Sequence, residues 1–400
     1  MSDSNSALNH IKNLSFHRMA SSPGEVKAIN YIRGFLEKAG IKHETESFTY
    51  SASTSILMKL AFFIVLIYII LFNLFLFTIP ILIIFFDFLL IGIIYFAIKF
   101  ILDMTRLFMV GKKKVSQNIT AKLKGTQEKN SRKLIIFSAH WDSVSTSLGA
   151  KSKKIMLLGG FLALVFLFIT SILAIWSLFD MGTLFELFRA VTVILSIFCA
   201  APFVILILSK KQNGSVGAID NATGISVLLE VAKRVKEEPL ENYDLIFLWC
   251  GAEELGLWGS KEFCVKNFDN LKEEYDLENS YNINIDMVGT YIGIVDKIGI
   301  ISKKPMNENL NKVLEATANQ LKIPVVMAKI PFGAGSDHMV LKSFAKKADK
   351  KMEITCISSD KDFKYIHSAL DTPDRCSADV LNGCIDICFN ALKSLDLRSN

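Results

Sequence analysis

The chain has 400 residues, of which 51% are hydrophobic and only 21% charged, and its formal net charge is +6. Soluble domains of similar apolar content carry more charge, and here the apolar residues gather in a few long runs. The composition therefore excludes a disordered protein and an ordinary soluble domain. The charge is too small to indicate nucleic acid as a partner. Seven cysteines without a CxxC pair indicate reduced thiols in a reducing compartment rather than a disulfide framework.

The first segment, 1–53, is polar and predicts a helix followed by a strand. A Ser-Ser-Pro-Gly-Glu start begins the helix near Pro23, and Gly40 ends it. Apolar residues recur between these points at helical spacing, namely Ala28, Ile29, Ile32, Phe35 and Leu36.

Long apolar spans follow, and each pair of them is long enough for two membrane crossings. One crossing takes about 20 residues, so the segment 54–103 fits two helices with a tight turn near Thr78–Pro80. The segment 155–209 fits a second pair, consisting of Ile155–Phe179 and Phe188–Ser209 around a loop with Asp180 and Glu186. Buried core helices are the alternative, but spans this long and this poor in charge are rare in water-soluble cores.

Positive charge flanks both hairpins on the side of the polar segments. The flanking residues are Arg106, Lys112, Lys113 and Lys114 for the first hairpin and Lys151, Lys153, Lys154, Lys210 and Lys211 for the second. The positive-inside rule therefore predicts a multi-pass membrane protein whose polar parts lie in the cytoplasm. An even number of crossings returns the chain to the same side. The polar segments 1–53, 104–154 and 210–400 are therefore expected to form one domain interrupted by two transmembrane hairpins.

Short apolar runs in the polar segments predict buried strands at Lys133–Ser138, Tyr243–Trp249 and Asn282–Asp286. A helix with an apolar face, Gly224–Val235, lies between the first two. Strands that alternate with helices predict an α/β fold with a mixed, mostly parallel sheet sandwiched by helices. In this class, ligands bind outside the carboxyl ends of the strands.

Five candidate metal ligands with nitrogen or oxygen donors lie at these strand ends or in loops: His140, Asp220, Glu254, Asp286 and His367. Two divalent ions about 3.5–4 Å apart need a carboxylate that bridges them and further ligands for each ion. Imidazole and carboxylate donors without thiolate suit zinc, manganese or cobalt. The set therefore predicts a two-metal hydrolase site.

Two more carboxylates stand beside these ligands. Residues two apart on an extended segment face the same way, so Asp142 can accept the second ring N–H of His140 and fix its tautomer. In the Glu253-Glu254 pair, one carboxylate can bind metal while the other takes a proton from water and passes it to the leaving amine.

Six ordered motifs resemble the co-catalytic metallo-exopeptidases, a family that includes zinc aminopeptidases, glutamate carboxypeptidases and membrane-bound endoplasmic reticulum metallopeptidases. The motifs are His140-Trp-Asp142-Ser, Gly217-Ala-Ile-Asp220-Asn-Ala-Thr-Gly224, Glu253-Glu254-Leu-Gly256-Leu-Trp-Gly259-Ser, Asn284-Ile-Asp286-Met-Val-Gly, Gly335-Ser-Asp337-His338 and Tyr365-Ile-His367-Ser-x-x-Asp371-Thr-x-Asp. The resemblance covers nearly all of the chain outside the apolar spans and implies the zinc-exopeptidase (phosphorylase/hydrolase-like) fold. The hairpins stand where soluble relatives have short connections.

At the matching positions, the resemblance implies that Asp220 bridges two divalent ions, Zn2+ with Mn2+ or Co2+ as alternatives. His140 and Asp286 would complete one site, and Glu254 and His367 the other.

The resemblance also implies roles for residues beside the ions. Glu253 would be the general base and then the acid, and Asp142 would orient His140. Asp337, His338 and Tyr365 would lie near the substrate, with a structural role as the alternative for His338.

The expected function is that of a membrane-anchored metallopeptidase, an aminopeptidase that cleaves small peptides at the cytoplasmic face, with a peptide and the lipid bilayer as partners. A carboxypeptidase, an amidohydrolase or a glutaminyl cyclase remains open, although the cyclase needs one metal and the chain offers ligands for two. An inactive membrane scaffold is a further alternative, but such relatives lose ligands or the base and none is missing here. A channel or transporter would need paired intramembrane charges or broken helices, and Asp87 alone is of this kind.

Overall fold

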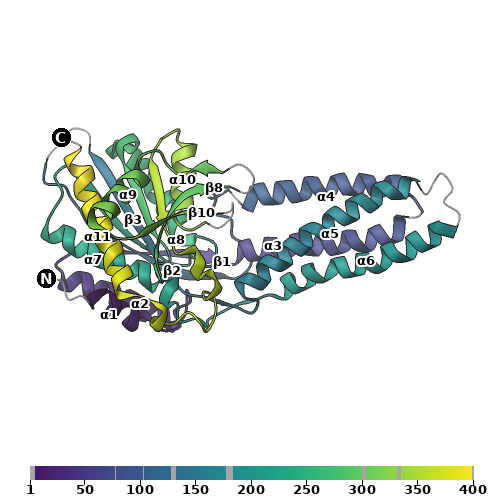
Figure 1. Cartoon of the computed structure of the whole chain (residues 1–400), viewed down its shortest axis with the longest axis horizontal. Helices are drawn as coiled ribbons and strands as arrows, with labels where there is room; N and C mark the ends of the chain where they lie inside the picture. Colours follow the sequence, from purple (N-terminus) through teal and green to yellow (C-terminus); the bar gives the residue numbers. More distant parts are fainter. Residues whose placement is uncertain are drawn as a thin grey trace. The chain divides into compact units, whose positions relative to one another are not determined.

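The computed structural model describes residues 5–76, 78–101, 103–127, 132–176, 183–299, 303–330 and 335–398. The chain divides into two compact units (Figure 1). The α/β unit consists of Met1–Ala52, Met104–Ser145 and Gln212–Asn400, and the helical unit consists of Ser53–Asp103 and Thr146–Lys211.

Among the described residues of the helical unit, four helices are long and apolar enough to cross a membrane. They are α3 (Ser53–Phe75), α4 (Pro80–Ile101), α5 (Ala150–Trp176) and α6 (Thr183–Leu208). Helix α5 begins earlier than predicted, so Lys151, Lys153 and Lys154 lie in its first turns. The predicted helix end at Phe179 and the loop residue Asp180 lie outside the described residues.

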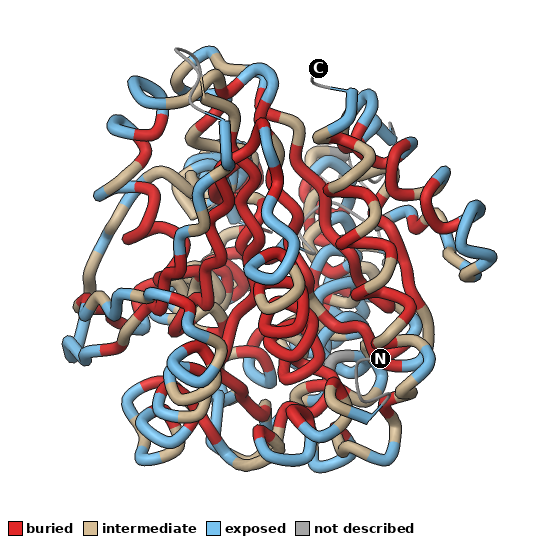
Figure 2. Tube along the Cα trace, turned by 90° about the vertical axis from the view of Figure 1, so that its left-hand side faces the viewer, coloured by how far each residue is buried: buried red, intermediate tan, exposed pale blue. Residues whose placement is uncertain are grey.

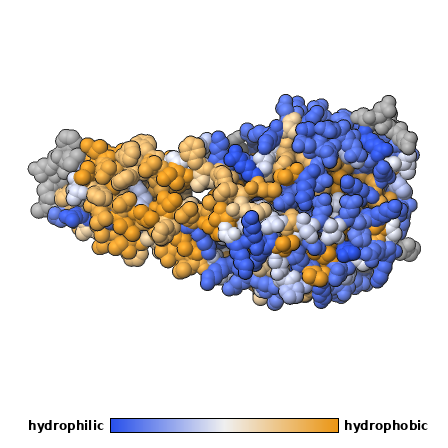
Figure 3. Space-filling view, turned by 180° about the vertical axis from the view of Figure 1, so that it is seen from behind, coloured by the Kyte–Doolittle hydropathy of each residue, from blue (hydrophilic) through white to orange (hydrophobic). Residues whose placement is uncertain are grey.

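The surface of the helical unit is apolar, and side chains such as Ile81, Phe96 and Phe198 are exposed on it (Figure 3). Its interior also holds polar contacts. Asp87 is buried and accepts a hydrogen bond from the Tyr68 hydroxyl. The one acid that stood out within the predicted membrane spans therefore has a partner inside the bundle.

The α/β unit is built on a nine-stranded sheet with the order β1-β2-β6-β3-β7-β11-β8-β10, and β9 pairs with β8. Strand β3 pairs in parallel with β6 and β7, and β7 pairs in parallel with β11. Strands β1 and β2 form an antiparallel edge. The strands are β1 (His43–Ser51), β2 (Lys113–Leu123), β3 (Lys133–His140), β6 (Tyr243–Cys250), β7 (Tyr281–Ile285), β8 (Ile292–Ile298), β9 (Lys304–Pro305), β10 (Val325–Ile330) and β11 (Glu353–Ile357). A separate two-residue pair joins β4 (Ser145–Thr146) and β5 (Lys211–Gln212).

Helices cover both faces of this sheet. One face packs against α1 (Ser6–Leu14), α2 (Pro23–Lys38), α7 (Thr223–Glu237), α9 (Leu310–Leu321) and α11 (Ala378–Leu397). The other face packs against α8 (Trp258–Glu274) and α10 (His338–Lys347). Short helical turns complete the unit at η2 (Ala218–Ala222), η3 (Leu277–Asn279), η4 (Asp360–Lys364) and η5 (Pro373–Arg375).

The central strands are buried on both sides, as expected for parallel strands between helical layers (Figure 2). Along β3, Ile135 and Phe137 belong to the core beneath α7, whereas Leu134 and Ile136 belong to the core beneath α8. The predicted fold class, a mixed and mostly parallel sheet flanked by helices, is confirmed. Strand β1 follows α2 as predicted for the segment 1–53, whereas helix α1 and strands β2, β4, β5 and β8–β11 were not expected from the sequence.

Candidate metal centre and active site

Three neighbouring strands bring most of the polar residues to one edge of the sheet. His140 is the last residue of β3, Asp286 follows β7, and the pair Glu253 and Glu254 lies in the loop after β6. Because β6, β3 and β7 are parallel neighbours, their carboxyl ends meet.

Asp220 and His367 reach the same place from loops. Asp220 lies in η2, immediately before α7, and His367 lies three residues after η4. The structure thus brings together all five predicted metal ligands.

Asp220 lies at the centre of the group, and its two carboxylate oxygens face different histidines. Its Oδ1 lies 3.0 Å from His140 Nε2, and its Oδ2 lies 3.2 Å from His367 Nε2. Asp286 Oδ1 lies 3.5 Å from His140 Nε2, and Glu254 Oε1 lies 2.9 Å from His367 Nε2. The result is two clusters of three ligand atoms, each within 4.8 Å of one another, that share Asp220.

These clusters fit divalent metal ions. The donors of a four-coordinate ion with bonds of about 2.0–2.2 Å lie about 3.3–3.6 Å apart, close to the spacings observed. Asp286 Oδ1 is buried and accepts no hydrogen bond within the described part of the chain. A buried carboxylate oxygen that accepts no hydrogen bond is stabilised when it binds a cation. The nitrogen and oxygen donors suit zinc, manganese or cobalt.

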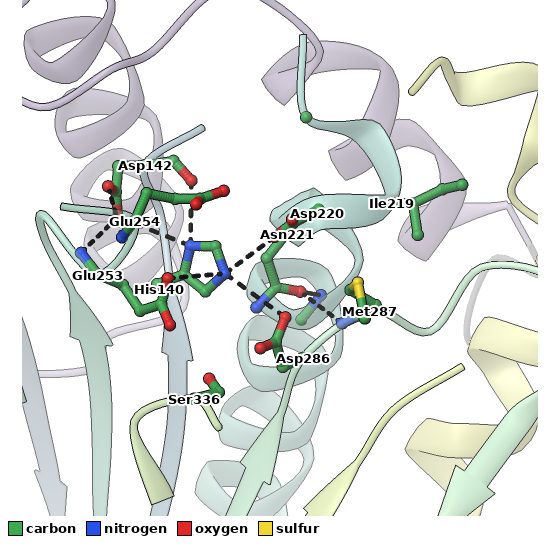
Figure 4. A network of polar contacts seen from close by, with 12 residues as sticks. His140, Asp142, Ile219, Asp220, Asn221, Glu253, Glu254, Asp286, Met287 and Ser336 are labelled. Carbon is green, nitrogen blue, oxygen red and sulfur yellow. Dashed lines mark hydrogen bonds and ion pairs between the residues drawn. The ribbon is translucent and has the colours of Figure 1, made fainter. Parts of the chain in front are cut away.

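The tautomer of His140 is fixed by a backbone contact (Figure 4). Its Nδ1 lies 3.0 Å from the backbone oxygen of Asp142, and a carbonyl can only accept, so Nδ1 carries the proton. Nε2 is therefore the ring nitrogen that faces Asp220 and Asp286 and that is available to a metal ion. The carboxylate of Asp142 is farther from Nδ1, at 3.6 Å. Asp142 thus orients His140 mainly through its backbone rather than through the side chain that the sequence indicated.

The Asp142 carboxylate holds the glutamate pair instead. It is fully buried and accepts hydrogen bonds from the backbone N–H groups of Glu253, at 3.0 Å, and Glu254, at 3.3 Å. This contact ties the end of β3 to the loop after β6, so the positions of His140 and the two glutamates are coupled.

Glu253 lies beside the clusters without belonging to either. Its Oε2 is 3.9 Å from His140 Nε2, and its side chain is 11% exposed, so it borders the clusters and retains access to solvent. Burial raises the pKa of Glu253 well above its ordinary value. His140 opposes this shift, and the negative charges of Asp337, Glu254 and Asp286 reinforce it.

Burial would lower the pKa of His140, but the adjacent carboxylates, with Glu253 first, raise it well above its ordinary value. The group of carboxylates around one imidazole is thus a region of strong negative potential. A divalent cation is the natural complement of such a region.

The loop that carries Asp220 is anchored by residues to which the sequence gave no role. Asp371 is buried, and its carboxylate accepts hydrogen bonds from the backbone N–H of Ile219, at 2.6 Å, and of Asp220, at 3.3 Å. The Asn221 side chain donates to the Ile285 carbonyl at 2.8 Å and so ties this loop to the end of β7. Asp371 stands in the last sequence motif, four residues after His367, which is the signal that could have indicated it.

Left-handed backbone occurs at three non-glycine residues of the site. Ala252 has a φ of 52°, Met287 of 67° and His367 of 56°. Ala252 precedes Glu253, Met287 follows Asp286, and His367 is itself a candidate ligand. Such conformations cost about 1–3 kcal/mol each and concentrate at functional sites, where the surrounding contacts maintain them.

The predicted substrate-binding residues differ in their access to solvent. Asp337 and His338 are 0% and 2% exposed, so neither presents a surface to a substrate in this structure. Burial lowers the pKa of His338 to about 3, as expected for a neutral interior imidazole, so the structural alternative fits His338 better than substrate contact. Tyr365 is half-buried, and its ring lies against the Arg375 guanidinium, 4.1 Å from the ring centroid.

Comparison with known proteins supports the family that the motifs indicated. The model of "Peptidase family M28" matches residues 204–392. Aminopeptidase YwaD of Bacillus subtilis is 34% identical over 126 residues, which are 31% of this chain and 26% of that protein. The matched segment thus spans about a quarter of the length of this curated relative.

Solved structures share the fold at low sequence identity. The aminopeptidase of Aneurinibacillus sp. strain AM-1 aligns with a TM-score of 0.56 at 16% identity over 98% of this chain and 94% of its own. The zinc aminopeptidase BSAP of Bacillus subtilis aligns with a TM-score of 0.54 at 14% identity over 98% and 94%. The glutaminyl cyclase of Fimbriiglobus ruber aligns equally well, with a TM-score of 0.55 at 13% identity over 98% and 95%. Aminopeptidases and a glutaminyl cyclase therefore share this fold, so only the residues of the site can separate the two activities.

The family match and the aminopeptidase relative confirm the resemblance to the co-catalytic zinc exopeptidases that the motifs predicted.

Proposed function

We propose that this chain, whose motifs and fold are those of the co-catalytic zinc exopeptidases, is a membrane-anchored aminopeptidase with two zinc ions. The observation that carries the proposal is the placement of Asp220, whose two oxygens face separate histidines in two clusters. A carboxylate shared between two ligand sets is the arrangement that a two-ion hydrolase requires. A site for one ion would need only one of the clusters.

The ligands divide into two sets around Asp220. His140 and Asp286 would hold one ion, and Glu254 and His367 the other. Bound there, the ions would make water a better nucleophile and polarise the substrate carbonyl.

Glu253 performs the proton transfers. Its carboxylate accepts the proton from the attacking water as the new C–O bond forms, and returns it to the amide nitrogen as the C–N bond breaks. Asp142 keeps Glu253 in place through the backbone N–H of that residue. His140 stays oriented through its own Nδ1–H and the Asp142 carbonyl.

The helical unit is the anchor. Its four helices have the length and composition of membrane spans, and lysines lie at the ends of α5 and α6 that border the polar segments. The positive-inside rule assigns those ends, and with them the catalytic residues, to the cytoplasm.

A panel of aminoacyl fluorogenic amides tests this function, using the full chain purified in detergent. We expect release of the fluorophore, loss of release after chelation, and recovery when Zn2+, Mn2+ or Co2+ is restored. The N-acetylated form of the best substrate is the matched control, because an aminopeptidase requires the free α-amine.

The other members of the family give different products. Release of the C-terminal residue from acetylated peptides, without cleavage of the aminoacyl amides, would indicate a carboxypeptidase instead. Conversion of a glutaminyl amide to its pyroglutamyl form without fluorophore release would replace it by a cyclase. Two bound ions with no product from any substrate would contradict the proposed peptidase activity.

A further inference from the structure

Arg18 is a buried cation to which the sequence gave no role. It lies between α1 and α2, is 0% exposed, and is among the largest fully buried side chains of the chain. Burying a guanidinium is costly unless its donors are satisfied and its charge is balanced. The hydrogen bonds that offset this cost show which segments of the chain Arg18 connects.

The donors of Arg18 go to backbone carbonyls from separate parts of the chain. Its Nε donates to Trp141 O at 2.7 Å, and its Nη2 donates to Gly217 O at 2.6 Å. Its Nη1 donates to Leu14 O at 2.9 Å and also to Val216 O. One planar group thus links the end of α1, the segment after β3 and the segment before η2.

Two of these segments carry metal ligands. Trp141 lies between His140 and Asp142, and Gly217 lies three residues before Asp220. The backbone of Arg18 makes a second link between these segments, because Ser143 Oγ accepts from the Arg18 N–H at 3.3 Å and donates to the Ser215 carbonyl at 3.0 Å.

The backbone at Gly217 is adapted to this contact. Gly217 has a φ of 60°, and a Cβ there would lie 2.7 Å from Arg18 Nη2 and 2.5 Å from Ser143 Cβ. A side chain at this position is therefore excluded both by conformation and by space. The close approach allows the guanidinium to reach the Gly217 carbonyl.

The charge of Arg18 is balanced by the acids of the site rather than by a direct ion pair. Within the described residues, its side-chain hydrogen bonds all go to carbonyl oxygens. Burial lowers the pKa of Arg18 to about 10, and attraction to the carboxylates of Asp371, Asp220, Asp142 and Glu254 opposes that shift.

We propose that Arg18 is a positioning residue of the metal centre, whose planar fork fixes the separation between the His140 segment and the Asp220 segment. The inference rests on the proposed function, because it concerns the ions that this function needs. Lysine would keep the charge, but its donors radiate from one atom and cannot span carbonyls on two segments in the same plane. The proposed positioning role therefore requires the planar geometry of the guanidinium as well as its charge.

Metal affinity tests the inference without use of activity. Arg18→Lys and Arg18→Gln are compared with the wild type by chelator competition for Zn2+ and by the visible absorption spectrum of the Co2+-loaded protein. Positioning partners of metal ligands change affinity by about 10- to 100-fold on substitution, so we expect a loss of this size in both variants, with an altered Co2+ spectrum.

Arg234→Lys and Arg234→Gln are the matched controls. Arg234 is an arginine on α7 that pairs with Asp386 at 2.6 Å and contributes no group to the clusters. We expect these controls to change thermal stability without a change in Zn2+ affinity. Arg18→Lys, which keeps the buried charge, remains the test should Arg18→Gln fail to fold.

The outcomes separate this inference from the proposed function. Wild-type affinity in folded Arg18→Lys would show that charge alone suffices, and wild-type affinity in folded Arg18→Gln would remove the positioning role. Either result overturns the inference and leaves the proposed function standing. A wild-type protein that binds no ion overturns both, whereas one that binds two ions tightly but cleaves no substrate overturns only the function.

Discussion

The division of labour between the adjacent glutamates leads to the sharpest prediction. Glu254 Oε1 lies 2.9 Å from His367 Nε2 inside a ligand cluster, whereas Glu253 Oε2 lies 3.9 Å from His140 Nε2, beyond hydrogen-bond distance. Glutamine has the shape of glutamate, so Glu253→Gln should keep the fold and the ions while removing the proton acceptor. General acid–base catalysis contributes about 10²- to 10⁴-fold to rate. We therefore expect kcat to fall by that factor, equivalent to about 2.7–5.5 kcal/mol of barrier.

The assay is turnover of the best aminoacyl amide together with the number of zinc ions bound per chain. Glu253→Gln should lose turnover at unchanged zinc content, whereas Glu254→Gln should lose zinc as well. Glu262→Gln, a buried acid on α8 outside both clusters, is the control and should retain both. Turnover of Glu253→Gln within a factor of two or so of the wild type would refute the assignment of the general base.

Two further predictions concern packing and topology. Gly224→Ala should lower the free energy of unfolding by about 1–3 kcal/mol, because the added Cβ would lie 2.4 Å from the Ile285 carbonyl oxygen. Gly34→Ala on α2, which has open space around it, should raise that free energy by about 0.5–1 kcal/mol. Thermal unfolding in detergent measures both changes, and a stabilised Gly224→Ala would contradict the tight helix–strand contact. The proposed membrane orientation can be tested with an impermeant thiol reagent on intact cells. The reagent should label Thr78→Cys at the α3–α4 turn, but should label Lys346→Cys on α10 only after the membrane is opened. The reverse pattern would contradict the proposed orientation.

The parts of the site that the sequence indicated are those with a local pattern. The strand that ends at His140 is a short apolar run, and the acids after β6 and β7 follow similar runs. Because parallel strands present their carboxyl ends at one edge, such patterns are enough to bring His140, Glu254 and Asp286 together. Asp220 and His367 were singled out by their donor type and their position at a strand end or in a loop, and the order of the motifs agreed with them.

The parts that the sequence did not indicate depend on contacts between distant segments. Arg18 lies in the loop between α1 and α2, which has no periodic pattern, and its role exists only because the backbones near Trp141 and Gly217 converge on it. The same holds for the Asp142 carboxylate, whose nearest donors are backbone N–H groups of another loop rather than the adjacent histidine. Hydrogen bonds to the backbone leave no signature in residue type, so side-chain spacing cannot predict them.

The most direct test of the central claim is anomalous diffraction at the zinc edge from crystals of the zinc-loaded protein. We predict two peaks about 3.5–4 Å apart, with one Asp220 oxygen bonded to each. His140 and Asp286 should complete the first site, and Glu254 and His367 the second. A single peak, or two peaks that do not share Asp220, would contradict the two-metal centre.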